Sequence, residues 1–256
     1  MNALFQPTEP YSLGDKTLYH FTKASSFFKI IKEMKLKVSR FNNLNDMNEA
    51  NLHNLYMNDN LIALNSRQYI EKHCSLVCFT QNYSVGNRPL KGTNHPAMWA
   101  HYANNSFGAC IVLDEEMLMQ KNSEILNKCF WQFADVEYSL RNGTDEASLQ
   151  LKDNPEDFVK ANYKQLFFLK HNDWSNEHER RLLMVDGSNY LDIDGCVKYI
   201  VLGDLFVKSK SHILKLKQYI TNSSYACSNN LDMRSFGRIF HSDHGYVDYS
   251  LNLQLL

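Results

Sequence analysis

Short apolar runs rich in β-branched and aromatic residues recur along the chain and predict β-strands. Polar turns and helical segments separate these runs, and strands and helices do not alternate regularly. The runs are TLYHF (17–21), LKVSRF (36–41), SLVCFT (75–80), GACIVLD (108–114), ERRLLMV (179–185) and VKYIVLG (197–203), with one more strand expected within CFWQFADVEYS (129–139) and another at the C-terminal end. The Asp186-Gly187 pair predicts a hairpin turn after ERRLLMV.

Apolar residues at helical spacing mark several intervening segments. Thr22 is expected to cap a first helix, and a long helix should end near Lys72. Pro96 opens a short helix, and Asn154 with Pro155 gives the clearest helix start. SHILKLKQYI (211–220) reads as an amphipathic helix. Because strands outnumber helices and alternate with them irregularly, the pattern predicts an α+β fold rather than a wound parallel sheet.

Composition narrows the class of protein. The 256 residues are expected to form a single domain over 1–256, since no repeat or long linker divides them. With 27 basic and 28 acidic residues, the net charge is -1, so the chain as a whole has no positive electrostatic field that would attract nucleic acid or an anionic membrane. The six cysteines lie in apolar contexts typical of buried thiols in a reducing compartment. With neither signal-peptide features nor a long apolar run, a cytoplasmic protein without a membrane partner is expected.

The segment HNDWSNEHERR (171–181) places Glu177 and Glu179 close to Arg180 and Arg181. In a helix, Glu177 and Arg181 would form an ordinary i,i+4 ion pair. In a strand, Glu177, Glu179 and Arg181 would share one face, and the two carboxylates would stand side by side. The following LLMV and Asp186-Gly187 favour the strand. Neighbouring carboxylates repel, so this geometry calls for an explanation such as a cationic ligand or a cationic intermediate.

Several motifs occur in an order that resembles an uncharacterised bacterial domain family of unknown function. They are LYHFT (18–22), NLND..E ending at Glu49, VCFT (77–80), MWAHYA…FGACI (98–111), K...W..E.E.R (170–181) and YIVLG (199–203). The resemblance spans about residues 17–220 and leaves 221–256 as a C-terminal extension. The arrangement is also distantly similar to the ADP-ribosyltransferase superfamily. That similarity implies two small, mostly antiparallel sheets with flanking helices, arranged as a split β-sandwich.

The superfamily resemblance implies a set of NAD-binding and catalytic residues. His20 matches the histidine that bonds the ribose and adenosine part of NAD, with Thr22 beside it. Tyr102 or Trp99 matches the aromatic residue that stacks on nicotinamide. Glu179 matches the catalytic glutamate, and Glu177 completes an E-x-E pair. Among Arg40, Arg180 and Arg181, the last is expected to contact the cofactor, although one of the three could instead pair with a glutamate.

The implied chemistry suits these residue types. Cleavage of the nicotinamide–ribose bond passes through an oxocarbenium-like centre, which a fixed carboxylate stabilises. NAD would be consumed as a substrate, without a metal, and no G-x-G-x-x-G or Walker motif is present. A protein or nucleic acid would accept the ADP-ribose, or water would in a glycohydrolase. Bacterial enzymes of this kind resemble toxins and phage-defence effectors, for which a cognate regulatory partner is expected.

Two other functions stay open. One is a catalytically inactive module of the same fold that senses a nucleotide or binds a protein. The other is a metal-dependent effector such as a nuclease. His73, Cys74 and Cys78 cluster in the sequence, and His241 with His244 forms H-x-x-H, yet neither set has the spacing of a zinc site. Asp46, Glu49 and Asp114 likewise lack a nuclease signature.

Overall fold

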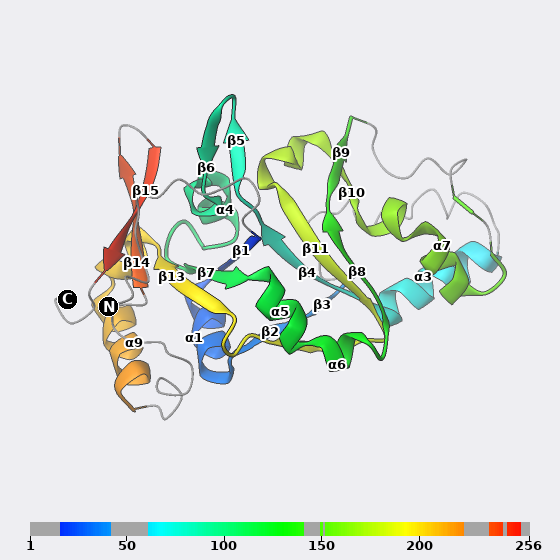
Figure 1. The fold of residues 1–256 in the computed structure, drawn as a ribbon, viewed down its shortest axis with the longest axis horizontal. Helices are drawn as coiled ribbons and strands as arrows, with labels where there is room; N and C mark the ends of the chain where they lie inside the picture. The colour runs from blue at the N-terminus through cyan, green and yellow to red at the C-terminus, as the bar shows by residue number, and fades with distance from the viewer. Residues whose placement is uncertain are drawn as a thin grey trace. The chain divides into compact units, whose positions relative to one another are not determined.

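The computed structural model describes residues 16–41, 61–140, 149–150, 152–222, 236–242 and 245–251 (Figure 1). Two compact units are present: unit 1 comprises 1–36, 79–121 and 192–256, and unit 2 comprises 37–78 and 122–191. Each unit draws on separated segments of the sequence, so neither corresponds to one continuous stretch. A single domain over 1–256 stays a prediction. No helix in the described part of the chain is long and apolar enough to cross a membrane.

Unit 1 is built on a mostly antiparallel sheet with strand order β15-β14-β13-β7-β1. β7 pairs antiparallel with β1 on one side and β13 on the other, whereas β13 and β14 are parallel. The elements are β1 (Thr17–Thr22), α1 (Ala24–Glu33), β5 (Tyr83–Val85), β6 (Arg88–Leu90), η2 (Gly92–Asn94), α4 (Pro96–His101), β7 (Ala109–Asp114), α5 (Glu115–Lys121), β13 (Val197–Leu202), α8 (Asp204–Lys208), α9 (Lys210–Asn222), β14 (Phe236–Ser242) and β15 (Gly245–Leu251).

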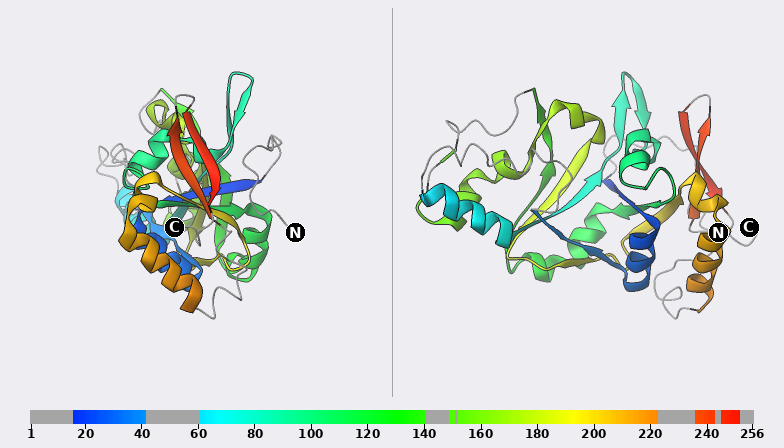
Figure 2. Two further views of the ribbon diagram at one scale, coloured as in Figure 1. Left: turned by 90° about the vertical axis from the view of Figure 1, so that its left-hand side faces the viewer. Right: turned by 180° about the vertical axis from the view of Figure 1, so that it is seen from behind.

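Aromatic contacts hold the helices of unit 1. Phe28 of α1 stacks on Tyr219 of α9 at 5.6 Å between ring centroids, and Phe27 meets Phe206 of α8 edge-on at 5.7 Å. The two helices α1 and α9 run side by side in both views of Figure 2. A separate apolar cluster joins Tyr19 and Phe21 of β1 to α4. Since side chains alternate along β1, the intervening His20 points to the opposite face from that cluster.

The paired strands of unit 2 follow the order β3-β4-β11-β8. β8 pairs antiparallel with β11, and β3 pairs antiparallel with β4. The elements are β3 (Ser39–Arg40), α3 (Leu61–His73), β4 (Cys74–Thr80), α6 (Ser123–Leu126), β8 (Phe130–Asp135), β9 (Glu137–Ser139), α7 (Pro155–Phe167), β10 (Leu169–His171), η4 (Asn172–Glu177) and β11 (Glu179–Val185). Two further strands, β2 (Lys35–Lys37) and β12 (Tyr190–Asp192), each span a boundary between the units along the chain, as do the last residues of β4.

The core of unit 2 places α3 and α7 against its sheet. Ile70 of α3, Phe158 and Phe167 of α7, and Leu183 of β11 are buried in one cluster. A parallel pair of short strands, β9 and β10, follows β8 and α7 respectively, with Lys170 opposite Tyr138. This pair matters for the site, because it determines which face receives the Lys170 side chain.

The α+β prediction with mostly antiparallel strands is confirmed, and most predicted strands are present. The segment after β4 contains the β5–β6 hairpin, turning at Gly86, whose φ is +59°. Two local predictions were wrong. Thr22 is not a helix cap: it pairs with Ala109 as the last residue of β1, and α1 starts at Ala24. Asp186-Gly187 does not close a hairpin, because the neighbours of β11 are β4 and β8.

The contribution of the Asn154 N-cap to the stability of α7 can be tested by mutation. The Asn154 side chain accepts a hydrogen bond from the Glu156 N–H at 2.8 Å, with Pro155 at the first helical position. We expect Asn154→Ala to lower the free energy of unfolding by about 1 kcal/mol, measured by urea denaturation. Asn154→Asp keeps an acceptor and should cost only a few tenths. Equal losses in the two variants would show that the cap does not contribute.

Candidate functional site

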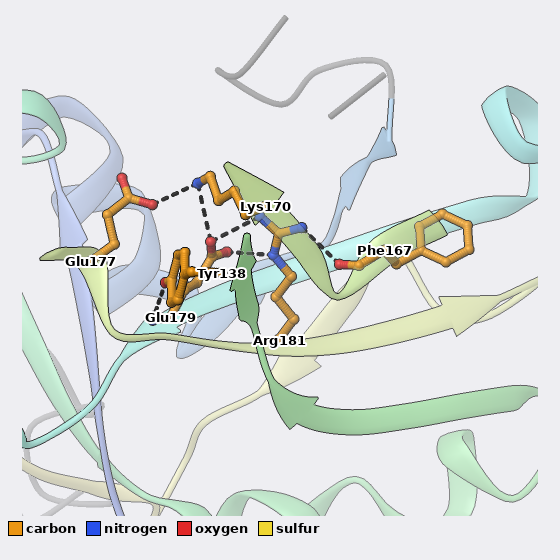
Figure 3. A network of polar contacts seen from close by, with 6 residues as sticks. All are labelled: Tyr138, Phe167, Lys170, Glu177, Glu179 and Arg181. Atoms are coloured by element: carbon orange, nitrogen blue, oxygen red, sulfur yellow. Dashed lines mark hydrogen bonds and ion pairs between the residues drawn. The ribbon is translucent and has the colours of Figure 1, made fainter. Parts of the chain in front are cut away.

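Two glutamates and a lysine meet in unit 2. Glu177 ends η4, Glu179 begins β11, and His178 between them adopts a left-handed conformation with φ of 44°. The Lys170 ammonium donates to Glu177 Oε2 at 2.6 Å and to Glu179 Oε2 at 3.2 Å (Figure 3). The lysine therefore bridges two carboxylates that come from different secondary-structure elements.

Arg181 holds the Glu179 carboxylate in a two-point contact. Its Nε donates to Oε1 at 2.6 Å and its Nη2 donates to Oε2 at 2.8 Å. The remaining Nη1 donates at 2.7 Å to the carbonyl oxygen of Phe167, the last residue of α7. Paired N–H donors of this kind fix both the position and the plane of a carboxylate. Glu179 and Arg181 are two residues apart on β11, which puts them on the same face of the strand.

Three more side chains complete this polar cluster. The Tyr138 hydroxyl accepts a hydrogen bond from the Glu179 N–H at 2.9 Å, which ties β9 to the start of β11. The Trp174 ring lies 4.7 Å from Lys170 Nζ, close enough for a cation–π contact. The Cys78 thiol of β4 also hydrogen-bonds the Glu179 side chain. We call Lys170, Glu177, Glu179 and Arg181, with these three neighbours, the E-x-E cluster.

The charges of the E-x-E cluster are buried and balanced. Glu177 and Glu179 are each 5% exposed, Lys170 is 6% exposed and Arg181 is 1% exposed. Burial alone would raise the pKa of Glu179, but the charge and hydrogen bonds of Arg181, then Lys170 and Cys78, lower it to about 2. Burial raises the pKa of Tyr138 well above its ordinary value, so this hydroxyl stays neutral. At neutral pH, Glu179 is therefore a permanently ionised and rigidly oriented carboxylate.

The sequence predicted part of this arrangement. The strand prediction for ERRLLMV is confirmed as β11, but Glu177 does not share that strand, because η4 includes it and His178 breaks the extended backbone. Lys170 was not predicted as part of the cluster. The spacing K...W..E.E.R carries the signal, although only the fold shows that the lysine points inward. The other two arginines lie elsewhere: Arg180 pairs with Asp135, and Arg40 donates to the Lys72 carbonyl.

The predicted NAD contacts of unit 1 lie on different faces of β1. His20 is half-buried and meets Phe79 edge-on at 6.0 Å, and Thr22 is buried in the same strand. Trp99 packs on the opposite face, fully buried, with Phe21 edge-on at 5.0 Å and its indole N–H donating to the Thr93 carbonyl at 2.7 Å. Tyr102, partly buried at the end of α4, also packs on that side. Trp99 is thus a core residue, which leaves Tyr102 as the more accessible aromatic.

A separate cavity of unit 2 has a volume of about 420 Å³. Its walls come from the end of α7 and from β8, β9 and β10: Ala134, Asp135, Glu137, Tyr163, Lys164, Gln165, Phe168 and Leu169. In the β9–β10 pair, Glu137 and Leu169 are partners, as are Tyr138 and Lys170. Because side chains alternate along a strand, the cavity and the E-x-E cluster lie on opposite faces of this pair.

Among the described residues there is no group of three or more His, Cys, Asp or Glu side chains placed to hold a metal ion. His73 pairs with Asp186 at 2.5 Å and stacks on Tyr69. Burial raises the pKa of Cys74 to about 12, which keeps that thiol protonated. His244 lies outside the described residues, as do Asp46 and Glu49.

Comparisons with known proteins found one family model and one solved structure to report. A family model described as "Protein of unknown function (DUF2971)" matches residues 98–182, which include the E-x-E cluster apart from Cys78. The predicted resemblance to a family of unknown function is confirmed over this segment. No protein with a curated description matches the chain in sequence. Among solved structures, Thermus sp. 2.9 DarT in complex with ADP-ribosylated ssDNA is similar with a TM-score of 0.34 and 8% identity, over 84% of this chain and 92% of DarT.

The Glu179–Arg181 pair can be tested with a double-mutant cycle. Glu179→Gln or Arg181→Met alone leaves a buried charge without its partner, and we expect each to lower the free energy of unfolding by about 3–5 kcal/mol. The double variant should lose less than the sum of the two, by about 1–3 kcal/mol, in urea denaturation at pH 7. Additive losses would mean that the two side chains do not stabilise each other.

The pKa of Glu179 generates a pH-dependent prediction. A carboxyl whose pKa falls from 4.5 to about 2 on folding contributes stability that is complete above the higher value and is lost as pH falls toward the lower one. Wild type should therefore be more stable than Glu179→Gln at pH 7, and the difference should shrink by about 3 kcal/mol between pH 5 and pH 2. Thermal unfolding across this range measures it. A difference that does not vary with pH contradicts the lowered pKa.

Proposed function

We propose that the chain is an NAD-consuming enzyme of the ADP-ribosyltransferase type, with Glu179 beside the bond that breaks. The observation that supports this most directly is the state of the Glu179 carboxylate: ionised, with its plane fixed by two N–H donors of Arg181. An oxocarbenium-like centre is stabilised by a carboxylate that is already charged and oriented before the reaction begins. Glu177 adds a second carboxylate within reach of the same cation, Lys170.

The reaction needs no metal. The bond between the ribose C1′ and the nicotinamide nitrogen breaks, and its electron pair leaves with nicotinamide as a neutral base. A nucleophile of the acceptor then bonds to C1′ and releases its proton to the solvent. The acceptor is a protein, a nucleic acid or water. In this proposal His20, Thr22 and Tyr102 position the dinucleotide, following the superfamily resemblance, and the enzyme acts as a toxin or phage-defence effector with a cognate regulatory partner.

A second function is favoured by a different observation. The two carboxylates are almost inaccessible, and their charge is matched by Lys170 and Arg181. A cluster in which every charge is satisfied would also be found in a module that has kept the fold without the chemistry. Such a module would sense a nucleotide or bind a protein partner, and its stability would rise with the ligand without turnover.

Turnover of NAD labelled in its adenine part separates the two functions. Purified protein is incubated with the labelled NAD, with and without cell lysate, while nicotinamide release and label transfer are followed. We expect release by wild type and a loss of at least about 100-fold in Glu179→Gln, because an electrostatic contact to the developing charge is removed. The labelled band would identify the class of acceptor.

The controls separate loss of chemistry from loss of folding. Glu33→Gln is a matched exposed change and should keep full activity. If Glu179→Gln is poorly folded, the Glu179→Gln/Arg181→Met double variant removes the pair without leaving a lone buried charge. Full release by a folded Glu179 variant would exclude this residue from catalysis. No release by wild type, with lysate present, would instead support the binding module, and a thermal-shift panel of nucleotides would follow.

A further inference from the structure

Lys170 links two carboxylates that the backbone alone does not hold together. Glu179 is fixed by Arg181 and by the Tyr138 hydroxyl, but Glu177 belongs to η4 and precedes the left-handed residue His178. The Lys170 ammonium reaches both side chains, at 2.6 Å and 3.2 Å. Its position therefore sets the distance between the two carboxylates.

The surroundings of Lys170 explain why it points into the E-x-E cluster. It lies in the middle of β10, opposite Tyr138 of β9, so its side chain projects to the face that carries Glu179. The side chain is 4% exposed, and the Trp174 ring packs against its ammonium. An ammonium so buried is held by its anionic partners, because moving a charge out of water without them is very unfavourable.

We propose that Lys170 is a positioning residue that holds Glu177 toward Glu179, so that the two carboxylates act as one unit. This inference rests on the proposed function for its catalytic consequence only. Without the ammonium, two carboxylates in a buried site repel each other, and the pair takes up a proton more readily. Arg181 cannot substitute for it, since its guanidinium is already committed to Glu179 and to the Phe167 carbonyl.

The test compares Lys170→Met with Lys170→Arg. Methionine fills similar volume without a charge, whereas arginine keeps the cation. Lys160→Met is the control, since Lys160 makes an exposed ion pair with Glu156 in the same unit. We expect the unfolding temperature of Lys170→Met at pH 7 to fall by about 10 °C, Lys170→Arg to recover at least half of that loss, and Lys160→Met to change little.

The pH dependence distinguishes positioning through charge from simple packing. The groups that face the Lys170 ammonium or its carboxylate partners include Glu177, Glu179, Arg181, Tyr138 and Cys78. In Lys170→Met the carboxylate pair binds a proton at higher pH, so the stability lost relative to wild type should diminish as pH falls from 7 to about 4. A packing role would give a loss that does not depend on pH.

Activity gives a second readout. The acid limb of nicotinamide release should move up by about one pH unit in Lys170→Met, a roughly tenfold loss of rate on that limb, and should return toward wild type in Lys170→Arg. The loss should appear in kcat more than in KM, because Lys170 acts through the carboxylates.

Each outcome decides the inference. A pH-independent stability loss, or an arginine variant as impaired as the methionine variant, overturns it. If Lys170→Met does not fold, Glu177→Gln is added: recovery of folded protein supports the inference, since repulsion has been removed, and no recovery contradicts it. If wild type releases no nicotinamide, the proposed function fails, and the stability profile still decides the role of Lys170.

Discussion

The buried ion-pair cluster of Lys170, Glu177, Glu179 and Arg181 is the interaction on which unit 2 depends most. It joins the end of α7, the β9–β10 pair, η4 and the start of β11. Each charge would be strongly unfavourable in this setting if its partner were removed, so the elements that supply the charges must form together. Buried ion pairs as a whole contribute little more to stability than apolar side chains of similar volume, although removal of one partner is costly. A need for charge at this position therefore explains the cluster better than a need for stability does.

That need restricts the function of the site. A carboxylate with a pKa of about 2 is a poor proton acceptor at neutral pH, which argues against general-base chemistry at Glu179. The same property suits electrostatic stabilisation of a cation, which requires only that the charge be present and oriented. The tight binding of Glu179 by Arg181 is thus compatible with a role in cleavage of a glycosidic bond. It would also suit a site that binds a ligand without turnover.

The sequence predicted the strands of unit 2 well because their apolar runs are buried on a sheet, and it predicted α7 because Asn154 and Pro155 mark a helix start by local chemistry. It could not place Glu177, because the position of this residue depends on the left-handed backbone conformation of His178. Histidine seldom adopts that conformation. Thr22 was misplaced because strand pairing with Ala109 outweighed its preference for a helix cap. The spacing of the K...W..E.E.R motif includes Lys170 and Trp174. Whether their side chains point toward the glutamates depends on the parallel pairing of β9 with β10, which no local sequence pattern predicts.

The charge balance of the cluster bears on its proposed ligand. NAD carries a pyrophosphate, and two unpaired carboxylates would repel that anion at short range. With Lys170 and Arg181 present, the formal charges of the four side chains cancel, and the repulsion seen by an approaching dinucleotide is much reduced. Local negative potential would then be felt only by a cation that comes within a few ångströms of the carboxylate oxygens, as a ribosyl centre would during bond cleavage. In the proposed reaction, an E-x-E pair neutralised in this way would favour the transition state over the anionic substrate, which is the condition for catalysis by differential binding.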